Sequence, residues 1–343
     1  MTAPELAGVL RGHTRRGTRR AVVVCAALVA LILALFAVAL FVGGSANIPA
    51  GQVIPAALGR TRGLSAYVVF ETRLPRAVTA VACGAAFGLA GALYQRLFRN
   101  PLATPDVIGV TEGSGLGAVI VITLLSGGGL GVQFGALIGG VVTAAVIFWF
   151  GWGHGVRLYR LILIGIGLTA VCSAATNLLL TRASQANADR AYHWLVGSLN
   201  GSSWDGVAVL AAAVALGAVG TWLARVPLAT LGTGDELATG LGVRITWVRA
   251  GVLLLGAAVA ALATSVTGPL GFVALVAGPI ATRLTGPGRE LAASALVGAA
   301  LVSCADLIAQ NAPLIGSSPT GAVTALIGAP YLIRLLLKRK ASA

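Results

Sequence analysis

Carboxylates close to long apolar runs are the first candidates for chemistry in this sequence: Asp106, Glu112 and Asp306. An ionised carboxylate at the centre of a membrane helix costs about 2.5 to 3.5 kcal/mol, so each needs a physical reason. We expect Asp106 to cap a helix and Asp306 to reach the membrane interface. Glu112 could face an aqueous cavity or carry a proton, but one isolated carboxylate gives a proton relay thin support.

Motifs for hydrolysis and metal binding are missing. Lysine occurs only at Lys338 and Lys340, which excludes a Walker A loop, because that loop needs its lysine on the phosphates. The sequence lacks H-E-x-x-H and G-x-S-x-G, and its histidines fall in expected loops: His13, His154 and His193. The cysteines stand singly in apolar runs, as packing residues do: Cys25, Cys83, Cys172 and Cys304. We expect no enzyme and no cofactor, with any ATP hydrolysis in another subunit.

The elements that must position these residues are membrane helices. Of 343 residues 57% are hydrophobic and only 10% are charged, and the mean hydropathy is +0.92. The apolar runs are continuous, which predicts helices and not the alternating strands of a barrel. We expect an all-α integral membrane protein with about ten spans, at 21–43, 77–97, 107–125, 132–150, 161–180, 207–224, 248–266, 268–284, 291–309 and 320–337.

One apolar run has an informative length. The 33 residues from Ala250 to Thr282 carry no charge and are broken only at Thr267-Gly268-Pro269. One span needs roughly 20 residues, so the run is too long for one crossing and too short for two. We predict one complete span followed by a short or interrupted one, an arrangement that transporters use near substrate paths.

Basic residues report topology. We divide the chain into a basic N-terminal tail (1–20), one permease domain (21–337) and a basic C-terminal tail (338–343), and treat 21–43 as a retained span. Placing both termini in the cytoplasm puts 18 of the 24 Lys and Arg residues inside, as the positive-inside rule requires. The net charge of +14 therefore does not indicate nucleic acid. Two external segments are long, 44–76 and 181–206, whereas the inner loop 225–247 should form two short amphipathic pieces that present a docking surface.

Several ordered motifs over about residues 50–340 resemble the iron-siderophore and cobalamin (FecCD-type) permeases of type II ABC importers. They comprise Arg73-Leu74-Pro75-Arg76, Gly91-Ala92-Leu93-Tyr94-Gln95, Leu97 to Asp106 with Asn100-Pro101, Trp194-Leu195-Val196-Gly197-Ser198, Leu231 to Val243, Gly268 to Val276, and Gly321 to Pro330. The resemblance implies a ten-helix protomer that pairs with a second, identical or similar protomer. It also implies two cytoplasmic ATPase subunits and an external substrate-binding protein.

The resemblance also suggests site residues. Arg73 and Arg76 would meet acidic groups of the binding protein. A third docking arginine of the cobalamin type is replaced here by Gln310, and Arg60 and Arg62 could substitute for it. ATPase coupling would use Leu231, Gly232, Gly234, Asp235, Glu236, Gly240, Leu241 and Gly242. Residues of the translocation path or intramembrane polar residues would be Gln95, Asn100, Pro101, Glu112 and Asn177.

These observations favour the permease of an ATP-driven importer for a ferric siderophore, in the bacterial cytoplasmic membrane. A substrate whose iron is already wrapped by its chelator fits the lack of a metal-ligand cluster. A cobalamin or haem permease of the same fold remains open, and so does a proton-coupled secondary transporter that uses Glu112.

Overall fold

The computed structural model describes residues 3–42, 48–151, 158–311 and 318–340, and its regular elements in these ranges are all helices. Ten of them are long apolar helices: α1 (Ala3–Val42), α4 (Leu74–Phe98), α5 (Val110–Leu124), α6 (Leu130–Gly151), α7 (Leu158–Arg182), α9 (Trp204–Leu231), α11 (Ile245–Thr267), α12 (Val273–Thr285), α13 (Glu290–Asn311) and α14 (Thr320–Lys340). Each overlaps one predicted span. Seven are long enough to cross a membrane, and the apolar parts of α5, α12 and α14 are shorter. The predicted all-α polytopic fold is confirmed.

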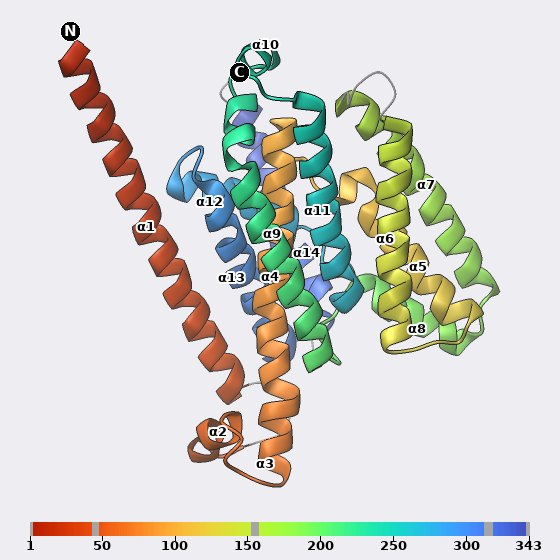
Figure 1. The fold of residues 1–343 in the computed structure, drawn as a ribbon. Coiled ribbons are helices and arrows are strands. Elements are labelled where there is room, and N and C mark those ends of the chain that lie inside the picture. The colour runs from red at the N-terminus through yellow and green to blue at the C-terminus, as the bar shows by residue number, and fades with distance from the viewer. Residues whose placement is uncertain (1–2, 43–47, 152–157, 312–317, 341–343) are drawn as a thin grey trace.

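Six short elements connect or extend the spans: α2 (Ala50–Ala57), α3 (Leu64–Ala66), the π-helix η1 (Tyr67–Arg73), the 3₁₀ helix η2 (Asp106–Ile108), α8 (Gln185–Val196) and α10 (Asp235–Gly240). In Figure 1, α10 lies at one end of the bundle, whereas α2, α3 and α8 lie at the opposite end. Both ends of the chain lie toward the α10 end, as an even number of crossings requires. We name the two ends the α10 end and the α2 end.

Helix α4 runs through the middle of the bundle, where α9, α11, α12 and α13 all contact it. Its close contact with α13 depends on glycines, which have no side chain. A Cβ atom on Gly84 would lie 2.3 Å from the Gly298 carbonyl oxygen, and one on Gly88 would lie 2.3 Å from that of Ser294. Such close backbone approach gives membrane helices packing that lipid cannot supply. These two glycines therefore allow α4 and α13 to pack closely.

A second glycine crossing joins α5 to α6. A Cβ on Gly117 would lie 2.1 Å from the Gly135 oxygen, and one on Gly139 would lie 2.1 Å from the Gly113 oxygen. Each helix thus presents a small-xxx-small pair to the other. The group α5 to α8 forms the part of the bundle on the right of Figure 1, beside α11.

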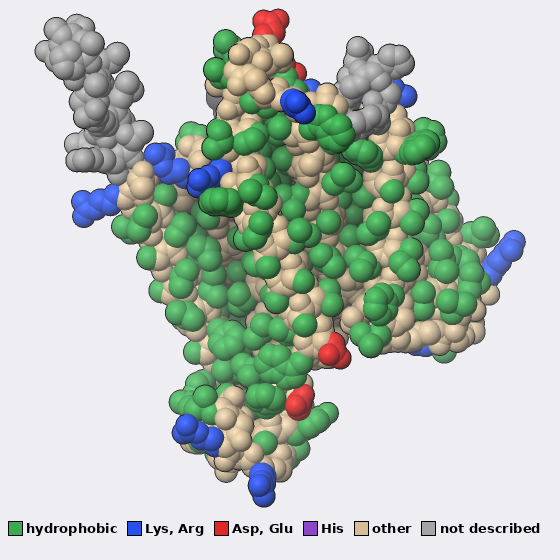
Figure 2. Space-filling model, in the orientation of Figure 1, with side chains coloured by type: hydrophobic (Ala, Val, Ile, Leu, Met, Phe, Trp, Pro, Cys, Tyr) green, Lys and Arg blue, Asp and Glu red, His purple; other side chains and the backbone are tan. Residues whose placement is uncertain are grey.

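The outer surface suits a bilayer. Figure 2 shows hydrophobic side chains covering the flank of the bundle, with basic groups gathered toward its two ends. Large aromatic residues in the halves of their helices nearer the α10 end are exposed, among them Trp149 (81%), Tyr159 (77%) and Trp222 (60%). Tryptophan and tyrosine favour the membrane interface, so these side chains mark where the hydrocarbon ends.

The break after α11 is as predicted. Helix α11 has 23 residues, the chain turns at Gly268-Pro269-Leu270, and α12 has only 13 residues. At 1.5 Å per residue α12 is about 20 Å long, less than the hydrocarbon core of roughly 30 Å.

Three boundaries differ from the sequence predictions. Helix α9 continues to Leu231, so the 225–247 region contains one short helix, α10, and not two. Residues 64–98 form one continuous helical stretch of 35 residues, which puts the Arg73 to Arg76 motif inside a helix. Helix α1 begins at Ala3, so most of the predicted N-terminal tail is helical. The predicted loop residue His154 lies outside the described residues.

Candidate functional sites

A buried ion pair occupies the α2 end of α4 and α13. The Arg76 guanidinium contacts both carboxylate oxygens of Asp306, with Nη2 to Oδ1 at 2.9 Å and Nε to Oδ2 at 3.1 Å. Gln310 Nε2 and the Thr320 hydroxyl also donate to this carboxylate, at 2.7 and 2.9 Å. Arg76 Nη1 donates to Asn200 Oδ1 at 2.7 Å. Three helices, α4, α13 and α14, thus meet at one carboxylate.

The expectation that Asp306 reaches the interface is wrong. The residue is only 2% exposed, because Arg76, Gln310 and Thr320 replace water around its carboxylate. A buried carboxylate is tolerated when it is paired and hydrogen-bonded. Gln310, which stands where a third docking arginine was considered, belongs to the same cluster.

Arg73 caps the C-terminal end of helix α1. It is 6% exposed, and its Nη1 donates to the carbonyl oxygens of Leu40 (2.8 Å) and Phe41 (3.3 Å) in the last turn of α1. The last carbonyls of a helix have no partner within it and favour a cation. In this conformation Arg73 and Arg76 both bind groups of their own chain, whereas Arg60 and Arg62 are exposed. Docking through any of the four stays a prediction.

Gln95 has a role that the sequence did not reveal. Pro279 has no N–H, so the carbonyl of Leu275 lacks its normal helical donor. Gln95 Nε2 on α4 donates to this oxygen at 3.0 Å and to that of Ala274 at 3.3 Å. Gly278 leaves space for the Gln95 side chain, because a Cβ atom at position 278 would overlap with Gln95 Oε1. Gln95 therefore supplies the donor that the proline removes.

A pocket of about 560 Å³, with several polar side chains in its lining, opens at the α10 end between α4 and the α12–α13 connection. It brings together three of the predicted path residues, Gln95, Asn100 and Pro101. Asn100 Oδ1 accepts from the Leu102 N–H at 3.0 Å and so shapes the turn after α4. Glu112 and Asn177 are not part of this pocket.

Glu112 lies in the first turn of α5, half-buried, and accepts from the Ser173 hydroxyl of α7 at 3.4 Å. Asn177 is exposed on α7. The N-cap of α5 is Gly109 and not the expected Asp106, which lies in η2 and accepts a hydrogen bond from the Thr111 hydroxyl. Burial raises the pKa of the Asp106 carboxyl, although the Thr111 hydrogen bond opposes this.

Helix α10 presents an exposed surface anchored by one carboxylate. Asp235 accepts from Arg249 Nη2 at 2.8 Å and lies 4.0 Å from Arg99, which ties α10 to α11 and to the end of α4. Glu236 is exposed, and Leu237 (63%) and Leu241 (71%) are exposed apolar side chains beside it. Asp235 therefore holds α10 in place, whereas Glu236 is exposed to a partner; the sequence prediction gave both acids the same role.

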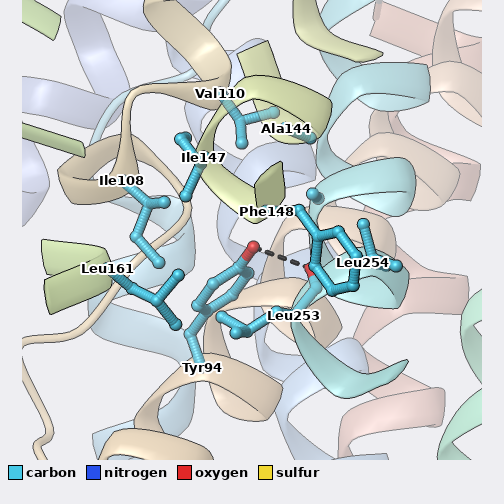
Figure 3. Close-up of a pocket in the computed structure, with 10 residues that line it drawn as sticks. Tyr94, Ile108, Val110, Ala144, Ile147, Phe148, Leu161, Leu253 and Leu254 are labelled. Carbon is cyan, nitrogen blue, oxygen red and sulfur yellow. Dashed lines mark hydrogen bonds between the residues drawn. The ribbon is translucent and has the colours of Figure 1, made fainter. Parts of the chain in front are cut away.

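The interior cavity in Figure 3 is apolar and very small. Its volume is about 20 Å³, roughly the space of one water molecule. Tyr94 points across it and donates to the Leu253 carbonyl at 2.9 Å, which fixes α4 to α11. A metal chelate cannot pass through this space. A further pocket of about 490 Å³, which the sequence did not reveal, opens at the α2 end beside α8, with the polar side chains Arg190, His193 and Asn200 in its lining.

A polytopic bundle of apolar helices with a pocket at each end, and with the short exposed helix α10 at one of them, is typical of a transport permease. The chain belongs to the FecCD transport family, which matches residues 29–338.

Relatives agree with this assignment. The chain is 37% identical to the ferric enterobactin permease FepG of Escherichia coli over 86% of this chain and 90% of that protein. It is 33% identical to the hemin permease HmuU of Yersinia pestis, over 87% and 92%. A solved ABC transporter described as metal-chelate type, in an inward-facing conformation, has a TM-score of 0.79 at 28% identity and covers 92% of this chain and 98% of its own.

Proposed function

We propose that this chain is the membrane-spanning permease of an ATP-driven importer and moves a ferric siderophore chelate. The observation that carries the proposal is the FecCD family match over nearly the whole chain, together with 37% identity to a ferric enterobactin permease. The hemin permease is a less similar relative at 33%, so a siderophore is preferred over haem as the cargo. Cobalamin is the second candidate cargo, as the resemblance of the motifs implies.

The α10 end faces the cytoplasm and receives the ATPase subunits. The excess of basic residues at this end supports the orientation, which places both termini inside. Leu237 and Leu241 are exposed close to Glu236 in the chain, and such a compact apolar and acidic surface suits docking of a second protein. Two ATPase subunits would act on two copies of this helix.

A second protomer completes the passage. The interior cavity next to Tyr94 is far too small for a chelate, so the chelate needs a route along the surface of this chain. A partner protomer, the same chain or a similar one, would enclose that route. Exposed Asn177 of α7 and half-buried Glu112 of α5 are polar side chains that we expect to face this route.

An external binding protein docks at the α2 end. Arg60 and Arg62 are exposed there and carry the positive charge that an acidic partner requires. Arg73 and Arg76 could contribute only after they exchange their present partners, the α1 carbonyls and Asp306.

Reconstitution in liposomes with the ATPase subunits and the binding protein tests the proposal. We expect ATP-dependent accumulation of a labelled ferric siderophore and little accumulation of haem or cobalamin. Accumulation of haem or cobalamin alone would reassign the cargo. Accumulation that follows a proton gradient without ATP would support the secondary-transporter alternative and exclude an ATP-driven importer.

A further inference from the structure

A long groove runs along the flank of the bundle between α4, α9 and α13. Its volume is about 800 Å³, and apolar side chains make up most of its lining, with buried Leu89 of α4 on its floor and Ala218 and Ala292 on its walls. The neighbouring α9 side chains Val219 and Leu223 are 59% and 63% exposed, so the groove opens on the lipid-facing surface. An occupant must therefore be apolar along most of its length.

Arginines stand at the α10 end of this groove. Arg96, Arg225 and Arg289 line it, and the described lining residues include no carboxylate. Glu290 offsets one of these charges, because its Oε1 lies 3.1 Å from Arg96 Nη1. Arg225 and Arg289 add two further positive charges to the lining where the groove meets the interface.

The level of the arginines in the bilayer is marked by Trp222. This ring is 60% exposed, and the Arg225 guanidinium carbon lies 5.1 Å from its centroid. Tryptophan prefers the headgroup region, and basic pockets between spans on the cytoplasmic side attract acidic headgroups. The charged end of the occupant therefore lies at headgroup depth.

We propose that this groove binds one anionic glycerophospholipid, with acyl chains along Leu89, Ala218 and Ala292 and its phosphate at Arg225 and Arg289. A chelate is a poor match, because the groove is apolar over most of its length. The identity of the leaflet rests on the proposed cytoplasmic orientation of the α10 end. Lipid binding itself needs neither ATP nor cargo, so a permease that failed to import would leave this proposal standing.

The test is lipid retention by the purified, delipidated protein in a neutral detergent, counted by native mass spectrometry. Dioleoylphosphatidylglycerol is titrated against dioleoylphosphatidylcholine, which has the same acyl chains, and inorganic phosphate is the third ligand. We expect tight retention of phosphatidylglycerol, weak retention of phosphatidylcholine, and no competition by phosphate. Arg225→Gln and Arg289→Gln should each weaken phosphatidylglycerol binding about fivefold, whereas Arg244→Gln, exposed at the same end outside the groove, should not.

A second pair of variants tests the apolar part. Ala218→Trp fills the groove and leaves the arginines in place, so it should also lower phosphatidylglycerol retention. Val219→Trp, one residue further and outside the groove, is its control. Equal retention of both lipids, equal losses in Arg225→Gln and Arg244→Gln, or complete displacement by phosphate would each overturn the proposal. Unchanged melting temperatures in lipid-free detergent confirm that the variants fold.

Discussion

The hydrogen bond that Gln95 makes across to α12 leads to a sharp prediction. Gln95→Met preserves the length of the side chain but removes its donor. The Leu275 carbonyl, which Pro279 already deprives of its helical partner, then has no donor from Gln95. A buried polar group left unsatisfied costs about 1 to 3 kcal/mol, so we expect the variant to lose about that much unfolding free energy.

Pro279→Ala supplies the internal control. It restores an N–H that can bond the Leu275 carbonyl within α12, so Gln95 becomes dispensable. Gln95→Met should then cost about 1 to 2 kcal/mol less in the Pro279→Ala background than in the wild type. Any effect of the proline on the unfolded chain cancels, because both arms of the cycle contain it.

The assay is unfolding in mixed micelles with increasing dodecyl sulfate, followed by circular dichroism for the four proteins of the cycle. Additive losses of unfolding free energy would contradict this role of Gln95, since they would mean that Gln95 stabilises the bundle independently of Pro279. Gln133→Met, a change of the same chemistry on α6, is a matched control for general effects of the substitution.

Three more predictions concern charged residues. Asp306→Ala should cost about 3 to 5 kcal/mol of unfolding free energy, because Arg76 stays in the bundle without its counterion. Arg76→Ala should cost much less in the Asp306→Ala background than in the wild type, and equal costs in both backgrounds would contradict the pairing. Glu112→Gln should leave ATP-driven uptake within about twofold of wild type. Loss of uptake in this variant would support proton coupling. Reversal of Arg60 and Arg62 to Glu should slow binding-protein association about tenfold at low salt and little at high salt, measured by surface plasmon resonance; a salt-independent result would contradict electrostatic docking.

The spans could be predicted because a membrane helix has to be continuously apolar over a known length. The short helix α12 was predictable for the same reason, since the 33-residue run has only one break, at Gly268-Pro269. The end of α9 was not, because residues 225–231 are helical although Arg225 and Pro227 resemble the start of a loop.

Side-chain partners were harder to predict. Arg76 and Asp306 are 230 residues apart, and no local pattern indicates that they meet. Gln95 was within reach of sequence reasoning: a proline inside an apolar helix leaves a carbonyl without a donor, and a glycine before it leaves space for a donor from elsewhere. Such a rule predicts that a donor exists but not which helix supplies it.

Transport by the reconstituted chain, with and without its ATPase subunits, shows whether this protein forms a passage that separate ATPases drive. We expect proteoliposomes to accumulate ferric siderophore only when the ATPase subunits, the binding protein and ATP are all present. Glu236→Arg, which reverses the outward-facing charge of α10, should abolish this uptake while the protein still inserts in the membrane. Accumulation against a gradient by the chain alone without nucleotide, or full uptake by Glu236→Arg, would contradict it.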